Sequence, residues 1–150
     1  MPKKINALRE KLLTCAREIL VGRGYSELTI RAIATECGVV PGTIYNYFPS
    51  KEKLVESVML EDWRARRAML DVKMQEAGSA LEAIRVLAEA LDGFVESYHE
   101  IWEKHPATMN DSSTFRKHHK QIVAQMCGML QPIMEKYDCM FHPVLPQFLA

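Results

Sequence analysis

Residues Thr29 to Lys53 read TIRAIATECGVVPGTIYNYFPSKEK, and this stretch decides the fold of the front of the chain. Apolar residues recur at helical spacing before Gly38, where a glycine ends a helix in the left-handed conformation without steric cost. Pro41 suits the first turn of a second helix, because a proline there loses no helical hydrogen bond. Ile44 and Phe48, four residues apart, face back toward the first helix. Two short helices joined by a tight turn predict a helix-turn-helix.

The outward face of the second predicted helix is poor in charge and rich in small, hydroxyl and aromatic side chains. This face consists of Pro41, Gly42, Thr43, Asn46 and Tyr47. Thr43 and Gly42 are small enough to approach base edges, whereas a Tyr hydroxyl and the Lys51 ammonium suit phosphate oxygens. The stretch therefore predicts a surface that binds double-stranded DNA.

The block T-I-R-x-I-A-x-x-x-G-V-x-x-G-T-I-Y-x-Y-F-x-S-K-E-x-L, from Thr29 to Leu54, closely resembles the DNA-binding signature of the TetR-type transcriptional regulators. The resemblance implies an all-α fold and transcriptional regulation, most often repression. It implies phosphate contacts by Thr29 and Lys51, backbone or sugar contacts by Tyr45 and Tyr47, and entry into the major groove by Arg31, Pro41, Gly42 and Thr43.

Arg31 is the best candidate for a base contact, because a guanidinium can bridge O6 and N7 of guanine. The ring of Tyr45 has a second possible role, since it could pack between helices instead of contacting DNA.

The sequence departs from the family pattern in two ways. Val40 and Pro41 stand where many members have Ser and Lys, which predicts a weaker hold on phosphate there. The chain of 150 residues is also shorter than usual for the family, whose two final helices form the dimer interface.

Charge is unevenly spread along the chain, although the formal net charge is zero. Residues 1–53 hold nine Lys and Arg against five Asp and Glu, and residues 54–150 hold ten against fourteen. A basic front and an acidic rear predict a module that faces a polyanion, followed by a second part with a different task. With the resemblance, these parts are a DNA-binding domain at 1–53 and a ligand-binding and dimerisation region at 54–150. No apolar run approaches the ~18 residues of a membrane span, and the start lacks a signal-peptide core. We expect a cytoplasmic protein with reduced thiols.

The remaining segments predict helices. A first helix runs from about Ile5 to Gly24, and Ser50 caps a long fourth helix that ends near Gln75. Apolar residues nearly encircle this fourth helix, Met69 and Val72 among them, which predicts neighbours on more than one side. Ser79 and Glu82 form a capping box that opens the next helix, and Pro106 ends it. A last helix contains Pro132, which should kink it. The predicted fold is a three-helix head joined through the long fourth helix to a helical bundle.

The rear helices predict a ligand pocket by resemblance, because in TetR-type regulators the helices after the fourth enclose a cavity. Methionine and aromatic side chains suit a small apolar or aromatic effector. The candidate lining residues are Phe94, Tyr98, Trp102, Met109, Met126, Met129 and Tyr137. A stripe of this kind at helical spacing also occurs where side chains pack only a core.

The resemblance implies a regulator that binds a palindromic operator as a homodimer and is released by the effector. The alternative is a ligand-binding or scaffold protein that keeps the head without binding an operator. No catalytic motif, phosphate-binding loop or cofactor motif is present, so we expect neither an enzyme nor a cofactor. Cys139 and His142 have a spacing that metal ligands can use, but packing thiols and surface histidines are the preferred interpretation.

Overall fold

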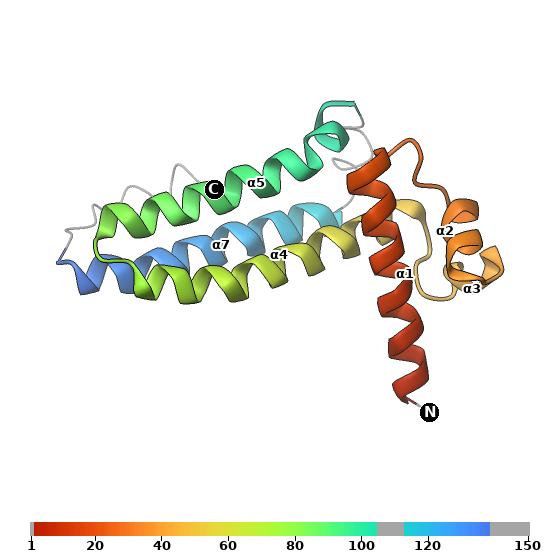
Figure 1. Cartoon of the computed structure of the whole chain (residues 1–150), viewed down its shortest axis with the longest axis horizontal. Helices are drawn as coiled ribbons and strands as arrows, with labels where there is room; N and C mark the ends of the chain where they lie inside the picture. Colours follow the sequence, from red (N-terminus) through yellow and green to blue (C-terminus); the bar gives the residue numbers. More distant parts are fainter. Residues whose placement is uncertain (1, 105–112, 139–150) are drawn as a thin grey trace. The chain divides into compact units, whose positions relative to one another are not determined.

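Six helices make up the described part of the chain, residues 2–104 and 113–138 of a computed structural model (Figure 1). The helices are α1 (Pro2–Arg23), α2 (Ile30–Cys37), α3 (Pro41–Tyr45), α4 (Lys51–Glu76), α5 (Ala80–Lys104) and α7 (Ser113–Lys136). No strand occurs in these two ranges, which confirms the predicted all-α class. None of these helices is both long and apolar enough to cross a bilayer.

Two compact units divide the chain. The first unit comprises Met1–Asp62 and Ser97–Met109, and the second comprises Trp63–Glu96 and Asn110–Ala150. Helices α4 and α5 each contribute residues to both units. The boundary predicted at residue 53 is a boundary between functions, and it does not coincide with the division into these two compact units. It stays a prediction.

The core of the first unit includes one face of α1 together with the inner faces of α2 and α3. Leu12, Ala16 and Ile19 of α1 are at most 1% exposed, as their spacing predicts. Ile33 of α2 and Ile44 of α3 are fully buried. Burying an aliphatic side chain of this size contributes ~1.5–3 kcal/mol, so these few residues hold α1, α2 and α3 in one arrangement.

A buried carboxylate ties α1 to α4 and α5 inside the first unit. Asp62 of α4 is 8% exposed and accepts hydrogen bonds from Arg17 Nε at 2.6 Å and from the Tyr98 hydroxyl at 3.0 Å. Arg17 belongs to α1 and Tyr98 to α5. The hydrogen bond to Asp62 raises the pKa of the Arg17 guanidinium above its ordinary value. Because donors from two helices satisfy the carboxylate, its burial is tolerated.

The turn after α1 favours glycine. Gly24 follows the end of α1 with φ of 89°, a left-handed conformation that other residues adopt only with strain. A β-carbon at this position would also lie 2.6 Å from a carboxylate oxygen of Glu100, so the Glu100 side chain would have to move aside. The side chain of Glu100 on α5 therefore lies against this turn.

In the second unit α4, α5 and α7 run side by side (Figure 1). The Trp63 ring meets the Phe94 ring edge to face, with 5.6 Å between the ring centroids. Just after α7, the Tyr137 hydroxyl donates to the carbonyl of Ala77 and so ties the end of α7 to the end of α4. The buried core cluster consists of Leu70, Met74, Ala77, Ala83, Leu87, Met129 and Ile133.

The predicted capping box opens α5, with one difference from the usual pattern. The Ser79 hydroxyl accepts from the backbone N–H of Glu82 at 3.1 Å. The Glu82 carboxylate accepts from the backbone N–H of Gly78 at 2.8 Å, one residue before the usual position. Both bonds use side-chain acceptors to satisfy backbone donors at the start of the helix.

The second half of α4 packs with both α5 and α7, since Leu70 and Met74 belong to the same core cluster as residues of those two helices. Leu70 and Met74 are 2% exposed, but Met69 is 65% exposed and Val72 is 55% exposed. Within residues 2–104 and 113–138, these two apolar side chains of α4 are therefore left uncovered. Pro106, predicted to end α5, lies outside the described residues.

Candidate nucleic-acid interface

Thr29 starts α2 by capping it, as predicted. Its backbone is extended, with φ of −118° and ψ of 151°, and its hydroxyl oxygen accepts from the backbone N–H of Ala32 at 3.0 Å. A Thr at this position satisfies one of the helix's unpaired N–H groups. Its hydroxyl proton is not used by that bond. Arg31 lies in the first turn of α2 with its side chain exposed.

Gly38 makes the tight turn between α2 and α3. Its φ of 68° is left-handed, and its N–H bonds the carbonyl of Thr35 at 3.3 Å. The N–H of Val39 bonds the carbonyl of Ala34 at 2.9 Å. This pair of bonds is the Schellman arrangement, which closes the end of a helix and turns the chain back.

Helix α3 presents one packed face and one open face. Pro41 occupies its first turn, as predicted, and Val40 before it makes no side-chain cap. Ile44 is fully buried and Phe48, just beyond the helix, is 3% exposed. On the open side Val40 is 69% exposed and Tyr45 is 52% exposed. Gly42 is also exposed, and Thr43 and Tyr47 are partly exposed.

The sequence left two roles open for the Tyr45 ring: packing between helices or contact with DNA. Half of its surface is accessible, so its ring does not fill a space between helices in this structure. Its neighbour Ile44 takes that packing role instead. Tyr45 is therefore placed where a backbone or sugar contact is sterically open, although that contact itself stays a prediction.

Lys51, predicted to contact phosphate, is engaged within the protein. Its ammonium donates to the backbone carbonyl of Tyr25 at 2.7 Å and lies 3.7 Å from the centroid of the Tyr25 ring. Partial burial lowers the pKa of this lysine from its ordinary value, while neighbouring Glu52 acts in the opposite direction. A phosphate contact would therefore add to these contacts or replace them. The sequence could not show this, because Tyr25 is distant along the chain.

The seven predicted pocket residues have different surroundings in the structure. Phe94 packs on Trp63, the Tyr98 hydroxyl binds Asp62, and the Tyr137 hydroxyl binds a backbone carbonyl. Met126 is partly buried. Met129 lines a cavity. Met109 and the side chain of Trp102 lie outside the described residues.

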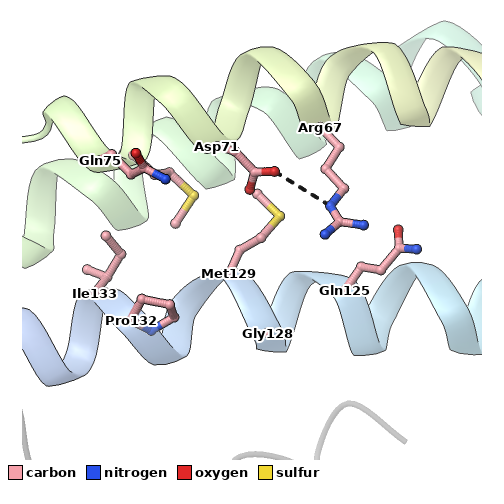
Figure 2. A pocket seen from close by; sticks show the side chains of 9 residues that line it. Arg67, Asp71, Gln75, Gln125, Gly128, Met129, Pro132 and Ile133 are labelled. Atoms are coloured by element: carbon pink, nitrogen blue, oxygen red, sulfur yellow. Dashed lines mark ion pairs between the residues drawn. The ribbon is translucent and has the colours of Figure 1, made fainter.

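That cavity, of about 240 Å³, lies between α4 and α7 in the second unit (Figure 2). Helix α4 contributes Arg67, Asp71, Met74 and Gln75 to its lining, and α7 contributes Gln125, Gly128, Met129, Pro132 and Ile133. The sequence predicted Met129 as a lining residue, but it did not predict the polar residues of the lining. A usable signal existed in Gly128 and Pro132, which lie four residues apart and so share one face of a helix.

Comparison with known proteins supports the assignment of the helix-turn-helix. Residues 12–58 match the profile of the bacterial regulatory proteins of the tetR family. The chain is 36% identical over 62 residues to the HTH-type transcriptional regulator UidR of Escherichia coli, a match that covers 41% of this chain and 32% of UidR. It is 36% identical over 64 residues to the HTH-type transcriptional repressor KstR2 of Mycolicibacterium smegmatis, covering 41% and 31%. The chain thus matches about a third of the length of these relatives.

Solved structures share the wider helical arrangement. SCO7518 from Streptomyces coelicolor superposes with a TM-score of 0.59 at 16% identity, covering 87% of this chain and 75% of SCO7518. The superantigen PfiT superposes with a TM-score of 0.59 at 21% identity, covering 95% and 79%. At these identities the likeness shows the fold and leaves function to the site. The sequence profile and the curated relatives together cover the helix-turn-helix, and by them residues 12–58 resemble the DNA-binding part of the bacterial regulatory proteins of the tetR family.

Proposed function

We propose that the chain is a DNA-binding transcriptional regulator, and specifically a repressor whose α3 lies in the major groove of its operator. The observation that carries the proposal is the open edge of α3. Ile44 and Phe48 anchor the helix, while Pro41 and Gly42 are exposed and Thr43 is partly exposed. A recognition helix needs this combination, because its edge must reach base edges without losing its packing.

Side chains around this edge divide into two proposed roles. Arg31 reads a guanine in the major groove, since its exposed guanidinium is a bidentate donor. Thr29, Tyr45, Tyr47 and Lys51 contact phosphate or sugar and so orient the head without reading sequence. For Lys51 the contact requires exchange of the Tyr25 carbonyl for a phosphate oxygen.

The proposed regulator is a homodimer on a palindromic operator, with two α3 helices about 34–36 Å apart in successive major grooves. An outward stripe on α5 supports self-association, because its residues alternate at spacings of three and four as in a coiled-coil seam. Arg85 and Asp92 flank the stripe, and an antiparallel second copy would pair each with its opposite charge. The stripe consists of Leu81, Ile84, Ala88 and Val95, with Leu91 between them partly buried against the core; Leu81 is 67% exposed, Ile84 44% and Val95 46%.

We further propose that a small-molecule effector bound in the second unit releases the operator. Helix α4 begins at Lys51, directly after the helix-turn-helix, and the same helix lines the cavity with Arg67 and Asp71. A ligand that prefers one position of α4 would thereby change the operator affinity. A coupling of ~1–3 kcal/mol changes affinity about 5- to 150-fold, which is enough for a switch.

The alternative function is a ligand-binding or scaffold protein that retains the helix-turn-helix but binds no operator. Two observations favour it to some degree. The start of α3 lacks both a side-chain cap and a positive charge at Val40 and Pro41. In addition, one protein of the same fold, PfiT, is named a superantigen.

Selection of bound sequences from a random pool of DNA duplexes tests the proposal. We expect recovery of an inverted repeat whose half-sites are spaced by about one helical turn, because two symmetric heads read it. Recovery of no preferred sequence, with binding that disappears at physiological salt, would refute the operator and favour the alternative.

A further inference from the structure

The cavity between α4 and α7 has an apolar floor. Met74, Met129 and Ile133 line it and are 2%, 8% and 3% exposed. Gly128 leaves the space above them open, because a β-carbon there would meet no atom within 4 Å. At about 240 Å³ the cavity is smaller than the ~300–1,000 Å³ of typical drug-sized ligand sites. It therefore suits a small molecule with an apolar body.

The rim of the cavity holds an arginine donor that the described protein leaves unsatisfied. Arg67 Nε is buried, and no hydrogen-bond acceptor for it lies in residues 2–104 and 113–138. The Asp71 carboxylate comes within 3.8 Å of this nitrogen, as the dashed line in Figure 2 marks, which is too long for a hydrogen bond. A buried N–H without an acceptor disfavours the empty state, and an acceptor on a bound molecule would remove that penalty.

Gln125 adds a second set of donors at the end of the cavity where Arg67 lies (Figure 2). Its amide oxygen accepts from the indole N–H of Trp63 at 2.9 Å, which fixes the amide and directs its NH₂ group away from that bond. Arg67 and Gln125 both line the cavity, and each carries N–H donors. Their natural partner is a planar, charged acceptor, since a guanidinium fork matches a carboxylate in geometry and charge.

We propose that this cavity binds a small monocarboxylic acid with an apolar or aromatic body, whose carboxylate the Arg67 guanidinium holds. The apolar body lies on the methionine and isoleucine floor, and the Gln125 amide donates to the second carboxylate oxygen. Asp71 competes for Arg67 in the empty cavity and turns toward solvent, to which it is 44% exposed, when the acid binds. As the class of the effector, this acid rests on the proposed function, whereas its binding can be measured without DNA.

Titration calorimetry with benzoate and hexanoate tests the site, with benzamide and hexanamide as neutral matches of the same shape. We expect the acids to bind the full chain and the amides to bind at least tenfold more weakly. Arg67→Gln should weaken benzoate binding about tenfold to a hundredfold, because it removes a charge-assisted hydrogen bond. Asp71→Asn should tighten benzoate binding about fivefold by removing a nearby like charge.

Arg64→Gln is the matched control, because Arg64 is an exposed arginine of the second unit that does not line the cavity. It should bind benzoate as the unaltered chain does. Equal affinity for acid and amide, equal loss in the Arg67 and Arg64 variants, or no binding of either acid would overturn the inference. Benzoate binding that depends on Arg67 but leaves the operator affinity unchanged would support the carboxylate-binding site. It would also refute release of the operator by the effector. Failure of the DNA selection leaves the calorimetric result intact.

Discussion

At Lys51 one ammonium group has to serve both the folded protein and the proposed DNA complex. It binds the Tyr25 carbonyl and stacks on the Tyr25 ring, although sequence alone indicates only a free phosphate ligand. Thr29 shows the opposite case, because its predicted cap is present with the expected geometry. Local roles such as caps depend on neighbours three residues away and are readable from sequence. A role that involves a residue 26 positions away depends on the fold, and it cannot be read from the sequence.

Lys51→Ala should weaken binding to every DNA sequence and reduce the slope of log affinity against log salt by about one unit. Lys73→Ala is the matched control, since it removes an exposed lysine from the second-unit part of α4. Binding assays at several salt concentrations measure both slopes. Equal slopes in the two variants would mean that Lys51 stays on Tyr25 and contacts no phosphate.

Arg31→Ala should relax preference at a single base pair, at a cost of ~1–3 kcal/mol for the preferred base. The measurement is competition of singly substituted operators from the duplex selection against both proteins. Uniform weakening across all positions would contradict a base contact and would assign Arg31 to the phosphate backbone instead.

Cys15 predicts a dependence of stability on alkaline pH. Burial, with help from the neighbouring Cys37 thiol, raises the pKa of the Cys15 thiol from 9.0 to about 12. The folded state then holds the proton more tightly than the unfolded chain. Its contribution to stability is complete below pH 9 and is lost as the pH rises toward 12.

Cys15→Ala removes that titration, so its urea midpoint should fall less between pH 8 and pH 11 than that of the unaltered chain. Comparing the two proteins cancels the lysines and tyrosines that titrate in the same range. A parallel decline in both would show that the Cys15 thiol ionises as easily in the folded state as in the unfolded state.

Among the elements, the helix-turn-helix follows most directly from its sequence. Gly38, Pro41 and Ile44 each have one local task, and the structure confirms all three. Helix α4 was harder to predict: its apolar residues indicate neighbours on more than one side, yet Met69 and Val72 are exposed. Periodicity reveals which faces of a helix are apolar, but not which of those faces another element covers. The polar rim of the cavity was missed for the same reason, since Arg67 and Gln125 meet only across two helices.

Gly38→Ala and Gly42→Ala should separate stability from DNA binding. At Gly38 an alanine meets no atom but must adopt φ of 68°, so we expect a loss of ~1 kcal/mol in unfolding free energy. At Gly42 the space is equally open, and alanine should maintain or raise stability by ~0.5–1 kcal/mol.

The same Gly42→Ala variant should nevertheless bind DNA more weakly, because a methyl group on the open edge of α3 keeps the helix from the bases. Chemical unfolding and operator binding measured on one preparation check both statements. Undiminished operator affinity in Gly42→Ala would place the α3 edge away from the groove.

For the whole molecule, the all-α class and the match of residues 12–58 to the tetR profile were predictable, because both rest on a short, specific signature. The two compact units were not, since each combines segments far apart in the chain and divides α4 and α5 internally. The sequence also left the surface for self-association open. In the structure the stripe on α5 with Leu81 and Val95 provides a candidate.

Leu81→Glu should halve the mass in solution if the α5 stripe joins two copies, because the seam would then bury a charge without a partner. Val21→Glu is the control, since Val21 is a 47% exposed apolar residue of α1 outside the stripe. Sedimentation equilibrium measures the mass of both variants. A monomeric unaltered chain would refute the homodimer and favour the scaffold alternative.

The left-handed backbone at Gly24 restricts which residues this turn accepts. A β-carbon there would meet the Glu100 carboxylate, which is the far end of a flexible side chain and can move aside. The φ of 89° would remain, and it strains a residue that carries a β-carbon. Replacing Gly24 therefore costs backbone strain even after Glu100 has moved.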